Sequence, residues 1–297
     1  MAIADRLQKL LPGDAARLLE AHAGRLTQIR LRAERPVQVA GCGFEAVGET
    51  PLAAGALRRA LAALMEYSLY ARQQDLDEGF FTLDDGSRVG VCGRMHAEGG
   101  RLRMEEVGSA CIRVARPVPG CAREIAALMD GGDGLRSTLL ASLPGMGKTT
   151  LLRDLARSLS ARGYCVAVAD ERHEIAACRQ GVPTLDVGLR TDVMDGCPRG
   201  EAIGRMIRAM APQVIVADEI GGAADAAALA DAARCGVAVA ASAHAGSFGE
   251  LMGRVCMRSI LRSGALQRVV LLGERPGHVI EVWRLKDGEG GSAWERA

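Results

Sequence analysis

From residue 137 to residue 285, short apolar runs alternate regularly with segments of helical periodicity. Strands that are apolar at nearly every position are buried on both faces, and helices between such strands are typical of a parallel sheet covered on both sides. We therefore expect a mostly parallel α/β sheet in this half of the chain. The expected strands are residues 137–141, 164–169, 214–217, 237–242, 268–272 and 279–285, and the expected helices are residues 149–162, 201–210, 223–234 and 248–261.

The first 115 residues lack this regular alternation. Helical periodicity is found in residues 5–19 and 52–69, and strand patterns are found in residues 28–32, 37–40, 79–83 and 88–92, the last two joined by a turn at 84–86. This mixture predicts a small α+β domain. Two prolines and a glycine between residues 115 and 120 indicate a boundary. We therefore expect an N-terminal domain at residues 1–115 and a second domain at residues 116–297.

Charge and aromatic content limit the partners of the chain. Lysine and arginine total 37 and aspartate and glutamate total 36, which gives a formal net charge of +1. Both predicted domains are balanced in charge, and aromatic residues make up 3% of the chain. Nucleic-acid-binding surfaces are usually basic, and single-strand binding relies on aromatic stacking. We therefore expect no nucleic-acid partner.

Membrane insertion and secretion are also unexpected. No apolar run approaches the roughly 18–20 residues of a spanning helix, and the N-terminal residues are charged, without the apolar core of a signal peptide. The nine cysteines include no C-x-x-C pair, and the five histidines have no metal-binding spacing. We expect buried, reduced thiols in a cytosolic protein and no zinc site.

The first apolar run of the second domain leads into Ser142-Leu143-Pro144-Gly145-Met146-Gly147-Lys148-Thr149-Thr150, which opens a helix. A strand, a glycine-rich loop and a helix are the setting of a P-loop, in which backbone N–H groups surround phosphates. Lys148, one of three lysines in the chain, is expected to place its compact charge on the β- and γ-phosphates of ATP, and Thr149 to offer its hydroxyl to Mg²⁺. Serine stands at position 142, where the G-x-x-x-x-G-K-[ST] pattern has glycine. The residues expected to bind the nucleotide are Pro144, Gly145, Met146, Gly147, Lys148, Thr149 and Thr150.

The apolar run at residues 214–217 ends in two carboxylates, Asp218 and Glu219. An apolar strand that ends in this way, downstream of a P-loop, resembles a Walker B strand. Asp218 is expected to hold the Mg²⁺ shell together with Thr149, and Glu219 to orient or deprotonate the attacking water.

Two further strands end in residues that carry chemistry. The run at 164–169 is followed by Asp170-Glu171-Arg172-His173-Glu174, and the run at 237–242 is followed by Ala243-His244. Ligands of open α/β sheets bind at the carboxyl ends of the strands. We therefore expect Glu171 and Glu174 to assist the water or the metal, and His244 to sense the γ-phosphate by a hydrogen bond.

Two other functions share these motifs. A nucleic-acid-dependent ATPase, such as a helicase or recombinase, would have the same core, but neutral charge and few aromatics count against it. A nucleotide switch that assembles a scaffold without being a motor is the second alternative, and the Asp218-Glu219 pair favours hydrolysis over it.

These motifs and several other stretches resemble a known family. The stretches are Ile29–Arg32, Ser68–Ala71, Gly86–Arg94, the P-loop through Asp154, Asp170–Arg172, Arg190–Pro198 with its continuation through Arg208 and Pro212 to Gly221, and Ser242–Ala245. Together they resemble the stage III sporulation protein AA family, a branch of the secretion-type P-loop ATPases that is related to type II and type IV secretion and pilus motors. The predicted fold is therefore a RecA-like P-loop ATPase domain with a mostly parallel sheet, preceded by a smaller α+β domain.

The resemblance implies more than the residues do. It implies an ATPase that uses ATP and Mg²⁺ as a motor or assembly factor of a secretion-like channel complex in endospore formation. It also implies a homo-oligomeric ring, expected to be a hexamer, in which arginines of the N-terminal domain approach the nucleotide; Arg88, Arg94 and Arg113 are the candidates. Such a protein would be cytoplasmic and peripheral, recruited to the cytosolic face of a membrane by membrane-protein subunits of the channel.

Overall fold

The computed structural model describes residues 3–41, 43–65, 76–83, 85–114, 118–178, 180–288 and 291–297. The chain divides into two compact units, Met1–Arg116 and Pro117–Ala297. Residues 66–69 of an expected helix, Asp84 of the expected turn and residues 115–117 of the expected boundary lie outside the described residues. None of the helices in the described ranges is long and apolar enough to cross a membrane.

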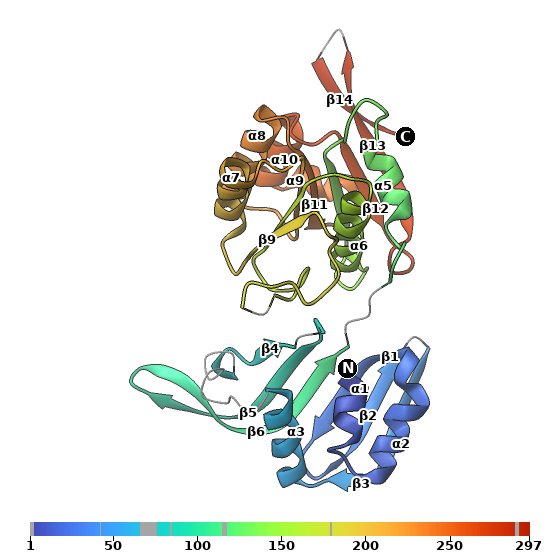
Figure 1. Ribbon diagram of the computed structural model, residues 1–297, viewed down its shortest axis with the longest axis vertical. Coiled ribbons are helices and arrows are strands. Elements are labelled where there is room, and N and C mark those ends of the chain that lie inside the picture. Colours follow the sequence, from blue (N-terminus) through green and yellow to red (C-terminus); the bar gives the residue numbers. More distant parts are fainter. Residues whose placement is uncertain are drawn as a thin grey trace. The chain divides into compact units, whose positions relative to one another are not determined.

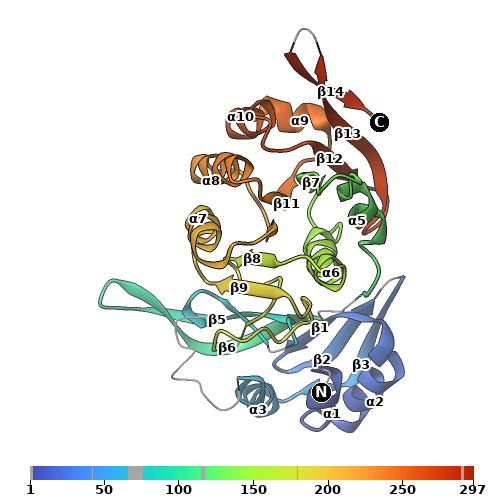
Figure 2. The ribbon, with the colours of Figure 1, turned by 45° about the horizontal axis from the view of Figure 1, so that its top comes forward.

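The first unit is a six-stranded sheet with the order β3-β2-β1-β6-β5-β4, in which neighbouring strands are antiparallel. Its helices α1, α2 and α3 lie on one face of that sheet (Figures 1 and 2) and share a core with Ile29, Leu31 and Ile112. The elements are α1 (Ile3–Gln8), α2 (Gly13–His22), the 3₁₀ helix η1 (Ala23–Arg25), β1 (Leu26–Arg32), β2 (Arg35–Gly41), β3 (Phe44–Leu52), α3 (Ala54–Leu64), β4 (Phe80–Thr82), β5 (Arg88–Glu98) and β6 (Arg101–Arg113).

Three features of this unit differ from the sequence prediction. The helix expected at 5–19 is two helices, because Pro12 has no N–H to donate and its ring excludes a continuing helix. Strands β3 and β6 were not expected, and β5 extends beyond Cys92 to Glu98. In β3 and the first half of β6, most side chains are exposed or half-buried, so no alternation of apolar and polar residues marks them as strands.

The second unit is an eight-stranded sheet with the order β14-β13-β12-β7-β11-β10-β8-β9. The strands from β12 to β9 are parallel, and β13 and β14 add an antiparallel edge. Ile215 and Val216 on β10 belong to different cores on the two faces of the sheet. Helices α7 to α10 cover one face and α5 and α6 cover the other (Figure 2). The elements are α5 (Arg123–Met129), β7 (Thr138–Ser142), α6 (Lys148–Ala161), β8 (Val166–Asp170), β9 (Thr191–Asp195), α7 (Arg199–Met210), β10 (Val214–Ala217), α8 (Ala223–Arg234), β11 (Ala238–His244), α9 (Phe248–Gly253), α10 (Val255–Arg262), β12 (Arg268–Leu272), β13 (Val279–Gly288) and β14 (Gly291–Arg296).

The expected mostly parallel sheet is confirmed, with two exceptions in its details. The helix expected at 248–261 is interrupted at Arg254, whose backbone is extended. Strands β9 and β14 and helix α5 were not expected. The sequence of β9 contains two aspartates and a threonine in five residues, so it lacks the apolar pattern of the other parallel strands.

The described cysteines do not follow the prediction of buried thiols. Cys92, Cys165 and Cys235 are exposed, and the other described cysteines are half-buried, namely Cys111, Cys121, Cys178, Cys197 and Cys256. Cys165 precedes β8 and Cys235 caps the end of α8, which are both positions at the ends of elements. Burial raises the pKa of Cys121 to about 11 and that of Cys178 to about 12, so these two thiols are unreactive at neutral pH.

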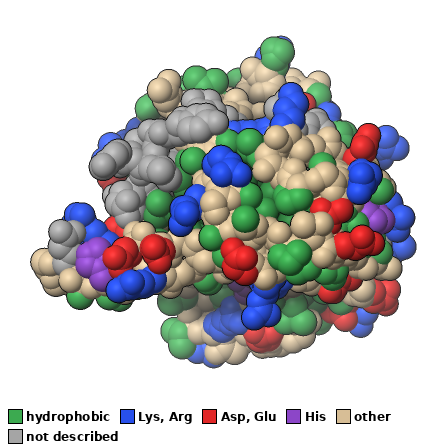
Figure 3. All heavy atoms as spheres, turned by 90° about the horizontal axis from the view of Figure 1, so that it is seen from below, with side chains coloured by type: hydrophobic (Ala, Val, Ile, Leu, Met, Phe, Trp, Pro, Cys, Tyr) green, Lys and Arg blue, Asp and Glu red, His purple; other side chains and the backbone are tan. Residues whose placement is uncertain are grey.

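The surface charge is mixed. On the face shown in Figure 3, basic and acidic side chains are interspersed, in keeping with the nearly equal totals of the two kinds.

Four parallel strands end next to one another in the second unit. Strands β7, β11, β10 and β8 are consecutive in the sheet, and their last residues are Ser142, His244, Ala217 and Asp170. The register pairs His244 with Ser142 and Ala217 with Ala169. The carboxyl ends of these strands therefore form one edge, at which the predicted site residues of this unit meet.

Candidate active site

The predicted P-loop connects the end of β7 to the start of α6. Gly145 and Gly147 both have φ of +80°, a conformation that favours glycine, and Gly147 is the N-cap of α6. Because glycine has no side chain to cap a helix, the first N–H groups of α6 face the loop without a capping oxygen from residue 147. Such a helix N-terminus is a ready site for a phosphate.

Serine at position 142 fits the loop without strain. It is the last residue of β7, it is fully buried, and its φ is not positive. Its Oγ donates a hydrogen bond of 2.9 Å to the carbonyl oxygen of Leu143. The backbone at the first position of the motif therefore does not require glycine in this chain.

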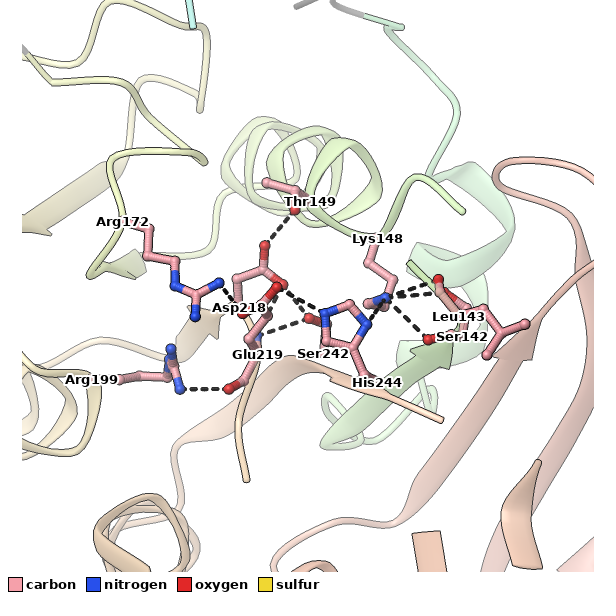
Figure 4. Close-up of polar contacts among 10 residues, drawn as sticks. All are labelled: Ser142, Leu143, Lys148, Thr149, Arg172, Arg199, Asp218, Glu219, Ser242 and His244. Carbon is pink, nitrogen blue, oxygen red and sulfur yellow. Dashed lines mark hydrogen bonds and ion pairs between the residues drawn. The ribbon is translucent and has the colours of Figure 1, made fainter. Parts of the chain in front are cut away.

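Lys148 is the first residue of α6, and 6% of it is exposed. Its Nζ lies 3.2 Å from the carbonyl oxygen and 3.2 Å from Oγ of Ser142, 3.3 Å from the carbonyl oxygen of Leu143 and 3.1 Å from Nδ1 of His244 (Figure 4). Burial lowers the pKa of Lys148, although the carboxylates of Asp218 and Glu219 act in the opposite direction. The ammonium thus sits among weak oxygen acceptors that phosphate oxygens can replace.

Asp218 links the P-loop to the neighbouring strands. Its Oδ2 accepts a hydrogen bond from Oγ1 of Thr149, and its Oδ1 accepts one from Oγ of Ser242 on β11. The two residues predicted to hold Mg²⁺, Thr149 and Asp218, are therefore in direct contact. Ser242 is a site residue that the sequence prediction missed, although it lies in the stretch Ser242–Ala245 that carries the family resemblance.

Glu219 has a left-handed backbone, with φ of +52°. For a residue with a side chain this conformation costs about 1–2 kcal/mol. Its carboxylate is held on both sides: Oε1 lies 2.9 Å from Nε2 of His244, and Oε2 is paired with Arg172. Partial burial would raise the pKa of Glu219, but the hydrogen bond with His244 and the charge of Arg172 outweigh burial and lower it below its usual value. The carboxylate is therefore ionised at neutral pH, as a general base must be.

The contacts of His244 define its tautomer. An ammonium group has no acceptor, so Nδ1 of His244 accepts from Lys148. A carboxylate has no donor, so Nε2 of His244 carries the hydrogen and donates to Glu219. The imidazole is thus a neutral link between the predicted phosphate-binding lysine and the predicted base (Figure 4).

The other two acidic residues predicted for the site lie beside Glu219. Glu171 pairs with Arg199 at 2.9 Å. Glu174 lines a small cavity together with Glu171, Asp218 and Glu219, while its backbone N–H donates to Asp170. Asp170 itself is 2% exposed and accepts hydrogen bonds from the backbone N–H groups of Glu174, Ile175 and Ala176. Asp170 therefore orders the loop that carries the other carboxylates.

The remaining predicted nucleotide-binding residues lie along the loop. The carbonyl oxygen of Met146 accepts a hydrogen bond of 3.0 Å from the backbone N–H of Gly277, which joins the loop to the turn before β13. Pro144 is exposed, and Thr150 lies in the first turn of α6. Their contacts with a nucleotide stay a prediction.

The three arginines suggested by the resemblance belong to the first unit. Arg88 and Arg113 are partners in the register of β5 and β6, and the guanidinium of Arg88 stacks 3.9 Å from the ring centroid of Phe80. Arg94 lies further along β5, where its Nε is 3.1 Å from Oε2 of Glu105. Their approach to a nucleotide stays a prediction.

Arg172 and Arg199 were also missed from the sequence as site residues. Arg172 lies in the stretch Asp170–Arg172, and Arg199 lies just after Pro198, in the continuation of the stretch that begins at Arg190 and ends at Gly221. Arg199 begins α7, where Pro198 is the N-cap. Pro198 was a signal that a helix begins at Arg199. It does not indicate which residues the side chain of Arg199 contacts.

The chain is similar to proteins of one sporulation family over nearly its whole length. The family described as "Sporulation stage III, protein AA" matches residues 2–289. Stage III sporulation protein AA of Bacillus subtilis (strain 168) is 35% identical over 295 residues, which cover 96% of this chain and 95% of that protein.

Solved structures match over most of the chain. The ATPase DotB of Legionella pneumophila matches with a TM-score of 0.58 at 14% identity, over 95% of this chain and 78% of that one. The pilus retraction motor PilT with bound ADP matches with a TM-score of 0.56 at 16% identity, over 95% of this chain and 81% of that one. At such identities the likeness shows the fold, and the predicted RecA-like α/β fold is confirmed.

Proposed function

Because the chain belongs to the stage III sporulation protein AA family, we propose that it is an ATPase that binds ATP with Mg²⁺ at this edge of its parallel sheet and hydrolyses it. One observation carries the proposal. The predicted phosphate-binding Lys148, the predicted base Glu219 and the histidine between them form one connected set of hydrogen bonds. Asp218 and Thr149 lie in contact beside them.

The groups at this edge fit a nucleoside triphosphate with Mg²⁺. Gly145 and Gly147 place no side chains of their own at the start of α6. The hydroxyl of Thr149 and the carboxylate of Asp218 are the hard oxygen ligands that Mg²⁺ prefers. Within the described ranges, no group of three or more His, Cys, Asp or Glu side chains is arranged to hold a metal. This agrees with a cation held mainly by phosphates and water and by one or two protein oxygens.

The protein groups have distinct roles in hydrolysis. Mg²⁺, when bound, supplies positive charge that offsets the charge on the phosphates. Lys148 would exchange its contacts with Ser142 and Leu143 for contacts with the β- and γ-phosphate oxygens. Glu219 would accept the proton of the attacking water at its carboxylate, which the N–H of His244 holds in place. Glu171 and Glu174 line the same cavity and are proposed to assist the water or the cation.

We further propose that this hydrolysis drives or assembles a secretion-like complex in endospore formation. The name of the Bacillus subtilis relative and the fold shared with a pilus motor support this role. The active form would be a homo-oligomeric ring, hexameric as the resemblance implies, in which Arg88, Arg94 or Arg113 of a neighbouring subunit reaches the nucleotide. Residues 1–115 would present these arginines and residues 116–297 would form the ATPase domain. Membrane-protein subunits of the complex would recruit the ring to the cytosolic face of the membrane.

Turnover measurements test the proposal. Glu219→Gln removes the proton acceptor and keeps the shape, so we expect ATP binding to persist and hydrolysis to fall by about 10²–10⁴-fold. Glu201→Gln is the matched control, since Glu201 is an exposed residue of α7 that pairs with Arg205. Hydrolysis should be measured with and without single-stranded DNA while oligomer size is monitored.

Each alternative function predicts a different result of the same experiment. Strong stimulation by DNA would favour the nucleic-acid-dependent ATPase. Assembly that depends on ATP but proceeds without turnover would favour the switch. Equal turnover in wild type and Glu219→Gln would remove Glu219 from the mechanism.

A further inference from the structure

Arg199 lies next to the proposed base Glu219, although Arg199 belongs to α7 and Glu219 follows β10. It is the first residue of α7, and its side chain is 10% exposed. Its NH1 donates a hydrogen bond of 2.6 Å to the backbone carbonyl oxygen of Glu219, and its NH2 lies 2.9 Å from Oε2 of Glu171. In Figure 4, Arg199 approaches Glu219 from the side opposite to Lys148. One planar guanidinium therefore joins the residues that follow β8 and β10 to the start of α7.

The backbone that Arg199 contacts is the strained one. Glu219 has its left-handed conformation at the point where the chain leaves β10. On the N–H side, Glu219 is held by Oδ1 of Asp218 and Oγ of Ser242, each at 3.0 Å. On the carbonyl side it is held by Arg199. Strained residues persist only where their surroundings determine them, and they are often found at active sites.

The segment after Glu219 is tied to the same arginine. The carboxylate of Asp225 accepts hydrogen bonds of 2.9 Å from the backbone N–H groups of both Gly221 and Gly222, which closes the turn into α8. The same carboxylate lies 3.5 Å from NH1 of Arg199. Loss of Arg199 would therefore free the carbonyl of Glu219 and remove a positive charge from beside the carboxylate that closes the next turn.

Arg199 retains this geometry at a cost. Its Nε is buried and has no hydrogen-bond partner in the described part of the chain. An unsatisfied buried N–H is unfavourable and needs an explanation. Two anchors, Glu171 and the carbonyl of Glu219, orient the guanidinium so that Nε faces neither of them, which explains this unsatisfied atom.

From these contacts we infer that Arg199 is a positioning residue for hydrolysis. It holds the backbone of Glu219 left-handed, so that the carboxylate points at His244, and Glu171 holds Arg199 in turn. The inference rests on the proposed function, because it assigns Arg199 an effect on the base of that reaction. Among the described residues, the hydrogen bonds and ion pairs of Arg199 are with Glu171, Glu219 and Asp225, none of which belongs to the P-loop. Arg199 should therefore affect turnover and leave ATP binding unchanged.

The experiment compares kcat and KM for ATP in Arg199→Ala and Arg199→Lys. A small displacement of a catalytic group can lower the rate by about 100-fold. We expect Arg199→Ala to lower kcat by about 10- to 100-fold and to leave KM within about threefold, since the phosphate-binding groups are untouched. Lysine keeps the charge but lacks the planar fork that joins two acceptors. Arg199→Lys should therefore fold and have an intermediate kcat.

Two further measurements separate positioning from general support of the fold. Added methylguanidinium should restore part of the kcat of Arg199→Ala by occupying the vacated space, whereas methylammonium should restore less. Arg205→Ala is the matched control, because Arg205 lies on the same helix but is exposed and pairs with Glu201 at 2.5 Å. Its kcat should equal that of the wild type.

The outcomes distinguish this inference from the proposed function. If wild type hydrolyses ATP, Glu219→Gln does not, and Arg199→Ala matches Arg205→Ala, the role of Arg199 is wrong and the proposed function stands. A rise in KM with unchanged kcat would also overturn the positioning role. If Arg199→Ala does not fold, Arg199→Lys decides, and a wild-type kcat in that variant overturns the inference. Absence of turnover in the wild type, or full turnover in Glu219→Gln, would instead contradict the proposed function.

Discussion

Among the described residues, the first unit buries one polar side chain, Ser87, whereas the second unit buries Lys148, Arg153, Asp154, Asp170 and Asp225. Removing an ion from water costs several kcal/mol unless it is paired or hydrogen-bonded. A unit that only had to fold would have no need of so many buried ions. The buried charges of the second unit lie at or behind the strand ends that form the site. Among the described residues, the core of the first unit therefore holds no buried charge, whereas the second unit holds buried charges whose desolvation opposes folding.

Of the variants that test this comparison, Lys148→Met should have the largest effect on ATP turnover, and it tests directly whether a buried charge opposes folding. Loss of the charge opposite the phosphates should lower turnover by at least about 100-fold. Because burial lowers the pKa of Lys148, its charged form is unfavourable in the folded protein, and methionine should leave the melting temperature equal or higher. Turnover and thermal unfolding are measured together.

Lys286→Met is the control for Lys148→Met. Lys286 is exposed and lies 2.6 Å from Glu295, so its replacement should change neither quantity much. A clear drop in melting temperature for Lys148→Met would show that the buried lysine stabilises the fold and would contradict the comparison.

Asp170→Asn should be the most damaging to stability. The amide of asparagine presents a donor where the carboxylate now accepts backbone N–H groups, and Arg153 nearby would lose a countercharge. We expect a loss of about 3 kcal/mol in the free energy of unfolding, measured by chemical denaturation. Asp231→Asn, at an exposed pair with Arg234, should cost much less. Equal losses in the two variants would mean that burial of Asp170 contributes little.

Asp14→Asn, in the first unit, should have the smallest effect on the free energy of unfolding, and this effect should depend on pH. Oδ2 of Asp14 accepts hydrogen bonds from the N–H groups of Thr50, at 2.8 Å, and Glu49, at 2.9 Å, which lower its pKa to about 2. Because the pKa is lower in the folded state, the stabilisation is present above the unfolded value of about 3.9 and is lost as the pH falls through about 2.

At pH 6 we expect Asp14→Asn to cost about 1 kcal/mol in the free energy of unfolding, and we expect the difference from wild type to fade between pH 4 and pH 2. Glu20→Gln, an exposed change on the same helix, is the control. A difference that stays constant over this pH range would show that the carboxylate charge is not involved.

The sequence predicted those parts of the molecule whose signal is local. The sequence places four site residues within a few positions of an apolar strand: Lys148, Thr149, Asp218 and Glu219. The strand pattern and the adjacent motif together therefore predict that these residues lie at the carboxyl ends of strands. Arg199 and Ser242 were missed as site residues because their importance depends on which strands are neighbours in the sheet. That order follows from packing of distant segments, and no spacing along the chain encodes it.

Missed elements have a similar physical reason. The strand Thr191–Asp195 lies at the edge of the sheet and carries polar residues, and Phe44–Leu52 has one buried position, Leu52. Edge strands are held by backbone hydrogen bonds, which any residue except proline supplies, and their side chains therefore show little pattern. The interior strands of the second unit were predictable because both of their faces are buried.

Serine at position 142 has a consequence for the unfolded chain. Glycine at this place would enlarge the set of conformations available before folding and would relieve no strain, because the native backbone is one that every residue adopts. A glycine within a strand costs about 0.5–1 kcal/mol relative to alanine for this reason. Serine avoids that entropic cost and adds an oxygen that lies 3.2 Å from Nζ of Lys148. A motif search that requires glycine at the first position would miss every chain that, like this one, has serine there.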